Sequence, residues 1–224
     1  MKSIRITIMM MSAILAFSCA PEQKDDMFDV PQDGYTFFEA DFRTVDFDAE
    51  AEQFWQKGID VGVFGTAEGV NERYTLKKAY DGKAVGEFYG PKVSGEVVAY
   101  YPYSESIECV KSDDNYALEV VLPAEQTYEE NSFGNGTWPM VAVSEDNNIT
   151  FKNVCGGIKL QLKGTQIIKS ITIQGKNNEK LAGAATVTAY TDETKPAIVM
   201  AQDASTTVTL NCGEGVGLNE SEPT

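Results

Sequence analysis

The sequence predicts an all-β protein, an antiparallel β-sandwich with at most one short helix. Short segments alternate between apolar and polar residues and are rich in β-branched and aromatic side chains. Stretches rich in Gly, Asn, Asp and Ser separate these segments at regular spacing. Only one stretch has the features of a helix. Many short strands with frequent turns are typical of a sandwich.

The first predicted strand is 35–42, which is strongly aromatic. The only predicted helix spans 48–57, with Asp48 as its cap and Gly58 as its stop. The segment 59–64 has apolar residues at odd positions, which predicts a strand with one buried face.

Six further segments complete the predicted strands. The two clearest are 158–163 and 171–174, because apolar and polar residues alternate strictly in both. This alternation is typical of an antiparallel strand that faces water on one side. No internal repeat is evident. The other four segments are 95–103, 117–122, 139–143 and 208–212.

The N-terminus has the features of a secretory signal. Lys2 and Arg5 precede the apolar run 6–17, which is shorter than the roughly 20 residues that a membrane span needs. Cys19 follows directly after a small residue, which resembles a bacterial lipoprotein signal. We therefore expect residues 1–18 to be removed and Cys19 to be acylated. The alternative is an ordinary cleaved signal with an incidental cysteine.

The residues after Cys19 indicate where the protein goes. The segment 19–34 is polar and acidic and contains two prolines, which predicts a disordered tether. Within it, four residues resemble the short signal that sends Bacteroidetes lipoproteins to the outer face of the outer membrane, although a solvated acidic tether is the simpler alternative. The expected location is the outer membrane, lipid-anchored and facing the cell surface. The four residues are Gln23, Lys24, Asp25 and Asp26.

Composition excludes several classes of function. The chain has 34 acidic and 18 basic residues, a formal net charge of −16, so it lacks the cationic surface that binds nucleic acid. It contains no histidine, which removes the commonest general base and metal ligand and rules out Ser-His and Cys-His nucleophiles. We expect no enzymatic activity, no metal and no cofactor.

Three cysteines remain once Cys19 is assigned to lipid. Cys155 and Cys212 both precede glycine in strand-like segments, which suits a disulfide between neighbouring strands of an exported protein. The alternative is that Cys109, Cys155 and Cys212 are small buried thiols.

Aromatic residues suggest a second possible function. An exposed platform of such rings would stack on sugars, and the protein would then be a cell-surface glycan-binding lipoprotein of a polysaccharide-uptake system. Aromatic residues in strands more often belong to a core. The residues concerned are Trp55, Tyr100, Tyr101, Tyr103 and Trp138.

From residue 35 onward the order and spacing of several blocks resemble the fimbrillin-like lipoproteins of Bacteroidetes. The resemblance implies that 35–224 is an N-terminal domain with a Greek-key, transthyretin-like β-sandwich. It also implies a structural or adhesive role in type V pili, as stalk, anchor or tip. The blocks are GIDVGVFG (58–65), VVAYYPYS (97–104), LPAEQTY (122–128), WPMVAVSEDNNITFKNVCGGIKLQLKG (138–164) and SITIQGKNNEKLAGAATV (170–187).

The same resemblance implies how subunits assemble. A protease removes the N-terminal segment of the exported precursor after a basic residue, and the vacated groove accepts a strand from another subunit. Arg43 is the candidate cleavage site, and a surface charge is the alternative. The implied partners are other pilus subunits, the membrane through the lipid, and host or bacterial surface ligands. Family members usually continue past the stretch that ends at Thr224, so we expect a truncated domain whose donor strand is not located; a reduced form of the protein is the alternative.

Overall fold

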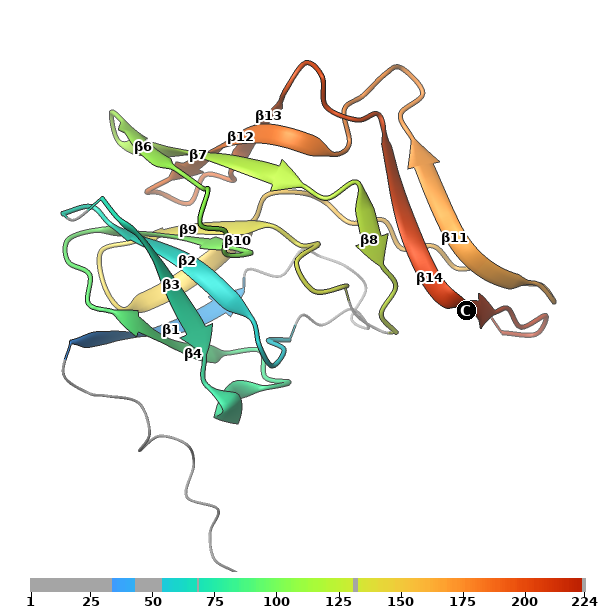
Figure 1. Ribbon diagram of the computed structural model, residues 1–224, viewed down its shortest axis with the longest axis horizontal. Helices are drawn as coiled ribbons and strands as arrows, with labels where there is room; N and C mark the ends of the chain where they lie inside the picture. Colours follow the sequence, from blue (N-terminus) through green and yellow to red (C-terminus); the bar gives the residue numbers. More distant parts are fainter. Residues whose placement is uncertain (1–33, 43–53, 68, 131–132, 223–224) are drawn as a thin grey trace, which may run out of the picture.

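A computed structural model describes residues 34–42, 54–67, 69–130 and 133–222 of the chain. These residues form three sheets and one 3-10 helix, η2 (Lys78–Tyr80), which confirms the predicted all-β class (Figure 1).

The largest sheet is a closed barrel rather than a layer of a sandwich. Its strands follow the order β1-β10-β9-β5-β2-β3-β4, and β4 pairs with β1 to close the ring. The bounds are β1 (Tyr35–Phe42), β2 (Asp60–Gly65), β3 (Asn71–Leu76), β4 (Gly86–Pro91), β5 (Val97–Tyr101), β9 (Met140–Ser144) and β10 (Asn148–Asn153).

The prediction of a Greek-key sandwich is therefore wrong in its finer part. The strand β1 pairs with β4 in antiparallel orientation and with β10 in parallel orientation. A strand bonded on both edges joins what would otherwise be two separate layers, and closure leaves the barrel without an exposed edge. Short alternating segments do not distinguish these two outcomes, because the local pattern is the same in both.

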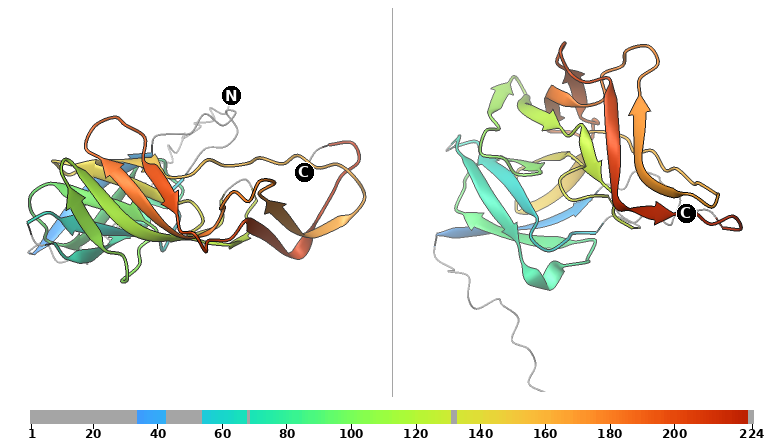
Figure 2. Two further views of the ribbon diagram at one scale, coloured as in Figure 1. Left: turned by 90° about the horizontal axis from the view of Figure 1, so that it is seen from above. Right: turned by 45° about the vertical axis from the view of Figure 1, so that its right-hand side comes forward.

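Two smaller sheets extend from the barrel (Figures 1 and 2). A four-stranded sheet, in the order β13-β12-β7-β6, packs on the outside of the barrel. A three-stranded sheet, in the order β11-β14-β8, lies at the far end of the molecule. The bounds are β6 (Cys109–Ser112), β7 (Asn115–Leu122), β8 (Glu125–Thr127), β11 (Ile167–Gln174), β12 (Gly183–Tyr190), β13 (Ala197–Met200) and β14 (Thr207–Gly217).

The strand β2 is buried on both faces, whereas the sequence predicted one buried face. Val61 and Val63 belong to the cluster inside the barrel, and Phe64 belongs to a second cluster beneath the four-stranded sheet. Gly62 lies between them, and a Cβ there would overlap the ring of Tyr100. A glycine is thus required where the Tyr100 side chain crosses the strand.

Two other predictions fail in the described residues. The segment 158–163 forms no strand, although its alternation is strict; instead the chain runs singly from β10 to β11 (Figure 2). A strand needs a bonded neighbour, and no described sheet supplies one. The predicted helix 48–57 is absent over 54–57, where Trp55 bridges to Lys83. Its first part, 48–53, lies outside the described residues.

Candidate strand-exchange site

The strand β1 is the part of the barrel that the predicted assembly would remove. It comes first in the chain, and it forms the seam between β4 and β10. Its register with β4 extends from Tyr35 opposite Pro91 to Ala40 opposite Gly86. Its register with β10 extends from Glu39 opposite Asn148 to Phe42 opposite Phe151. Removal of β1 would expose the backbone groups of both neighbours.

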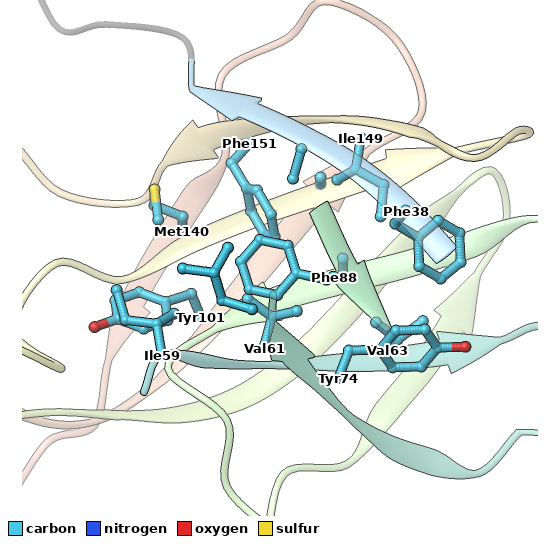
Figure 3. Close-up of a cluster of buried hydrophobic side chains, with 14 of the residues drawn as sticks. Phe38, Ile59, Val61, Val63, Tyr74, Phe88, Tyr101, Met140, Ile149 and Phe151 are labelled. Carbon is cyan, nitrogen blue, oxygen red and sulfur yellow. The ribbon is translucent and has the colours of Figure 1, made fainter. Parts of the chain in front are cut away.

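Phe38 is the largest described side chain that β1 contributes to the barrel interior. It is 1% exposed, and its ring centre lies 5.1 Å from that of Tyr74. Phe88 and Phe151 belong to the same core, and Figure 3 shows Phe38 in one cluster with both. Without Phe38, the vacated groove would be lined by aromatic rings, which water solvates poorly.

Two positions further along, the barrel requires a small residue. Ala40 is 1% exposed and lies directly opposite Gly86. The indole of Trp55 fills this space: its N–H donates to the Ala40 carbonyl at 3.2 Å, and a Cβ on Gly86 would approach its Cδ1 to 2.7 Å. The ring also packs edge-on against Phe88 at 4.8 Å. The inner face of β1 thus presents a large aromatic residue, Phe38, followed by a small residue, Ala40.

The outer face of β1 has both aromatic and acidic residues. Glu39 and Asp41 are exposed. Phe37 is half-buried, and the ammonium of Lys77 lies 4.3 Å from its ring centre, within the range of a cation–π contact. Lys77 also forms an ion pair with Glu87 on β4. A strand in this groove is therefore held through its inner face and its backbone, and through an outward contact with Lys77 at the position of Phe37.

Most of the predicted site residues lie outside the described residues. These are Cys19, the export residues 23–26 and Arg43. Arg43 nevertheless has a defined position in the sequence, because it directly follows Phe42, the last residue of β1. Cleavage there would separate β1 from the rest of the barrel.

The described cysteines are free thiols in this structure. Cys155 packs against the cluster beneath the four-stranded sheet, together with Cys109, and Cys212 is on β14 of the three-stranded sheet. Burial raises the pKa of Cys109 to about 11 and raises that of Cys155. Low reactivity follows, because the thiolate is the nucleophile. The pairing of Cys155 with Cys212 stays a prediction.

Four of the five rings of the proposed sugar platform are unavailable to a sugar, and the fifth, Tyr103, is half-buried, with the guanidinium of Arg73 5.7 Å from its ring centre. Trp55, Tyr100, Tyr101 and Trp138 are all buried, at no more than 8% exposed. The Tyr101 hydroxyl donates to the Asn135 side chain at 2.7 Å, so its polar end is also engaged inside the protein. Buried rings present no face to a sugar, and these four residues are better explained as core.

The described residues contain no group of three or more His, Cys, Asp or Glu side chains placed to hold a metal ion. In the same part of the chain, no helix is both long and apolar enough to span a membrane. Comparison of the chain with protein-family models, with curated proteins and with solved structures found no match.

Proposed function

We propose that this protein is a surface lipoprotein of the fimbrillin type, a structural and adhesive subunit of a pilus that assembles by β-strand exchange. The observation that supports this most is the position of β1, which closes the barrel and ends one residue before Arg43. A cut after Arg43 converts β1 from part of the chain into a bound peptide that another strand is able to replace.

The physical basis is the state of the barrel without β1. The edges of β4 and β10 would lose their hydrogen-bonding partner, and the aromatic interior would be open to water. A donor strand satisfies the backbone groups and buries the apolar side chains in one step. The same features that make the open barrel unstable would make its binding to a donor tight.

The groove also defines the donor. The strand must present a large apolar side chain at the position of Phe38 and a small one at the position of Ala40, where Trp55 and Gly86 leave little room. Between them it needs an outward position that tolerates polar residues, as Glu39 shows. The role further implies lipid anchoring at Cys19 and partner subunits that supply the donor.

Limited proteolysis with an arginine-specific protease tests the cleavage step. After the predicted signal, the only arginines are Arg43 and Arg73. Arg73 is in β3, which pairs with β2 and β4, so the folded barrel should resist a cut there. We expect one cut, after Arg43, and mass spectrometry identifies it. An Arg43→Ala variant is the control that should remain intact.

Electron microscopy of cells tests the cellular role. Cells without the gene should have fewer or altered surface filaments, and re-expression of the Arg43→Ala variant should not restore them. Unchanged filaments in both strains would count heavily against a pilus subunit.

A further inference from the structure

The chain has one Asn-Gly pair, Asn135-Gly136, in the turn that precedes β9. This pair is chemically labile, because a glycine leaves its amide nitrogen free to approach the preceding side chain. The nitrogen of Gly136 attacks Cγ of Asn135 and a C–N bond forms, while the side-chain amino group and the amide proton leave together as ammonia. Water then opens the five-membered succinimide ring, and position 135 becomes aspartate or isoaspartate. Water has access, since Asn135 is exposed.

The fold holds this pair in a turn that opposes the reaction. The Thr137 N–H donates to the Gly134 carbonyl at 3.1 Å, and Gly136 has a φ of 78°. A closed turn with a positive φ at its third residue is type II. In such a turn the Gly136 nitrogen points away from the Asn135 side chain. Ring closure therefore needs a rotation about ψ of Asn135 that breaks the turn.

A single hydroxyl holds both reacting groups. The Tyr101 hydroxyl donates to Oδ1 of Asn135 at 2.7 Å and accepts from the Gly136 N–H at 2.7 Å. A tyrosine hydroxyl is able to do both only while it is protonated. Burial raises the pKa of Tyr101, so this group stays protonated at neutral pH. The Gly136 amide is held as a donor, and the Asn135 side chain is fixed away from its nitrogen.

Tyr101 has a fixed position in the barrel. It is the last residue of β5, is 7% exposed, and packs edge-on against Trp55 with the ring centres 6.5 Å apart. Beside the turn, Phe133 packs against Trp138 with the ring centres 4.1 Å apart. Because both sides are held by aromatic packing, the two hydrogen bonds of the Tyr101 hydroxyl break only when the turn moves away from the barrel.

We propose that Asn135-Gly136 is a deamidation site that the Tyr101 hydroxyl keeps closed, so that position 135 is modified only while the turn is open. Tyr101 is a positioning residue, because it takes no part in the reaction itself. Isoaspartate adds one atom to the backbone and cannot re-form the turn between Gly134 and Thr137. The product is therefore a lasting record of the time that the turn has spent open. The inference does not depend on cleavage after Arg43.

Peptide mapping by mass spectrometry at mildly alkaline pH tests this proposal. Tyr101→Phe keeps the ring but removes the hydroxyl, and the loss of two hydrogen bonds should raise deamidation at position 135 of the folded protein by about tenfold. Tyr100→Phe is the matched control. It removes a neighbouring buried hydroxyl, which donates to Asn71 at 2.9 Å and to the Ser104 carbonyl at 2.8 Å and has no partner in the turn. This variant should deamidate as the wild type does.

Two further measurements cover the case in which Tyr101→Phe does not fold. Thr137→Ala removes the hydroxyl that donates to the Gly134 carbonyl at 2.6 Å without changing the barrel core, and it should raise the rate by a smaller factor. In urea, where the turn is absent, the wild type and all variants should deamidate equally fast. The folded wild type should be slower than any of them.

Three results would overturn the inference. Equal rates in the folded wild type and in folded Tyr101→Phe would show that the hydroxyl does not protect the pair. An equal rise in Tyr100→Phe would show that the effect is a general loss of stability. A folded wild type that deamidates as fast as the chain in urea would show that the site is not closed. A rise confined to Tyr101→Phe and Thr137→Ala, with equal rates in urea, is the expected result.

Discussion

The barrel and the three-stranded sheet are built from similar sequence patterns but differ in how completely they are buried. Inside the barrel, Val63, Tyr74 and Phe151 are 0% exposed. In the sheet β11-β14-β8, apolar residues such as Ile171 and Leu210 lie opposite each other but remain only half-buried, and Ile167 is 66% exposed. The difference is closure: the barrel covers its own apolar face, and the described residues supply no second layer for the small sheet.

This contrast teaches that alternation alone does not measure the stability of a strand. In β11 the alternation is strict over residues 171–174 and the pairing with β14 is regular over residues 170–174, yet the strand contributes little buried area. The strand β2 has a glycine at its centre, yet it is among the most buried strands in the molecule. Stability should therefore be concentrated in the barrel.

The largest effect should come from truncating the barrel core. Phe151→Ala removes a ring that packs edge-on against Trp55 at 5.7 Å and leaves a cavity. We expect a loss of about 3–5 kcal/mol in the free energy of unfolding. Urea denaturation measures it, and a loss below about 1 kcal/mol would contradict the central place of the barrel.

A smaller effect is expected where the four-stranded sheet meets the barrel. Gly62→Ala places a Cβ in the ring of Tyr100, so the ring or the strand must shift, at a cost of about 1–3 kcal/mol. Gly217→Ala on β14 is the matched control, because a Cβ there has no neighbour within 4 Å. Thermal unfolding of the two variants should differ clearly, and equal stability would contradict the packing described for Gly62.

An effect confined to alkaline pH should arise from Tyr100. Burial raises its pKa to about 12, whereas an unfolded tyrosine titrates near its ordinary value of 10. The contribution of the neutral Tyr100 hydroxyl to the free energy of unfolding is complete below pH 10. It is lost as the pH rises from 10 to 12, because Tyr100 releases its proton more readily in the unfolded state. Urea midpoints measured across this range should fall with pH. In a Tyr100→Phe variant the urea midpoint should fall less steeply with pH. An unchanged dependence on pH would contradict the raised pKa of Tyr100.

The smallest effect should be found in the three-stranded sheet. Ile171→Ala removes a half-buried side chain, and we expect a loss of about 1 kcal/mol or less. Hydrogen exchange gives the complementary measurement: the amides of β11 and β14 should exchange before those of β2 and β5. Equal protection of the two regions would show that the sheet is covered by something beyond the described residues.

Much of the secondary structure was predictable from local pattern. The segments 35–42, 171–174 and 208–212 all lie in strands, because their alternation or aromatic content is a property of adjacent residues. Other strands were harder to predict. β4 (Gly86–Pro91), which the sequence did not predict, contains two glycines, Gly86 and Gly90. These glycines fit because the rings of Trp55 and Tyr74 fill the space beside them, which only the packed structure reveals.

The candidate site, like the secondary structure, was only partly predictable from the sequence. The sequence placed Arg43 directly after the predicted strand 35–42, because that order is a property of adjacent residues. The burial of Trp55 and Tyr101 was not predictable, because an aromatic side chain in a strand has the same local signature whether it faces solvent or core.

By itself, the sequence determined the all-β class, the absence of histidine chemistry and the position of most strands, because these depend on composition and on neighbouring residues. Only the tertiary structure decided that the strands close into a barrel, that β1 forms its seam and that the segment 158–163 has no partner. These outcomes depend on which distant strands pair, as Ala40 pairs with Gly86. Such pairing is set by how large and small side chains fit together across the whole fold.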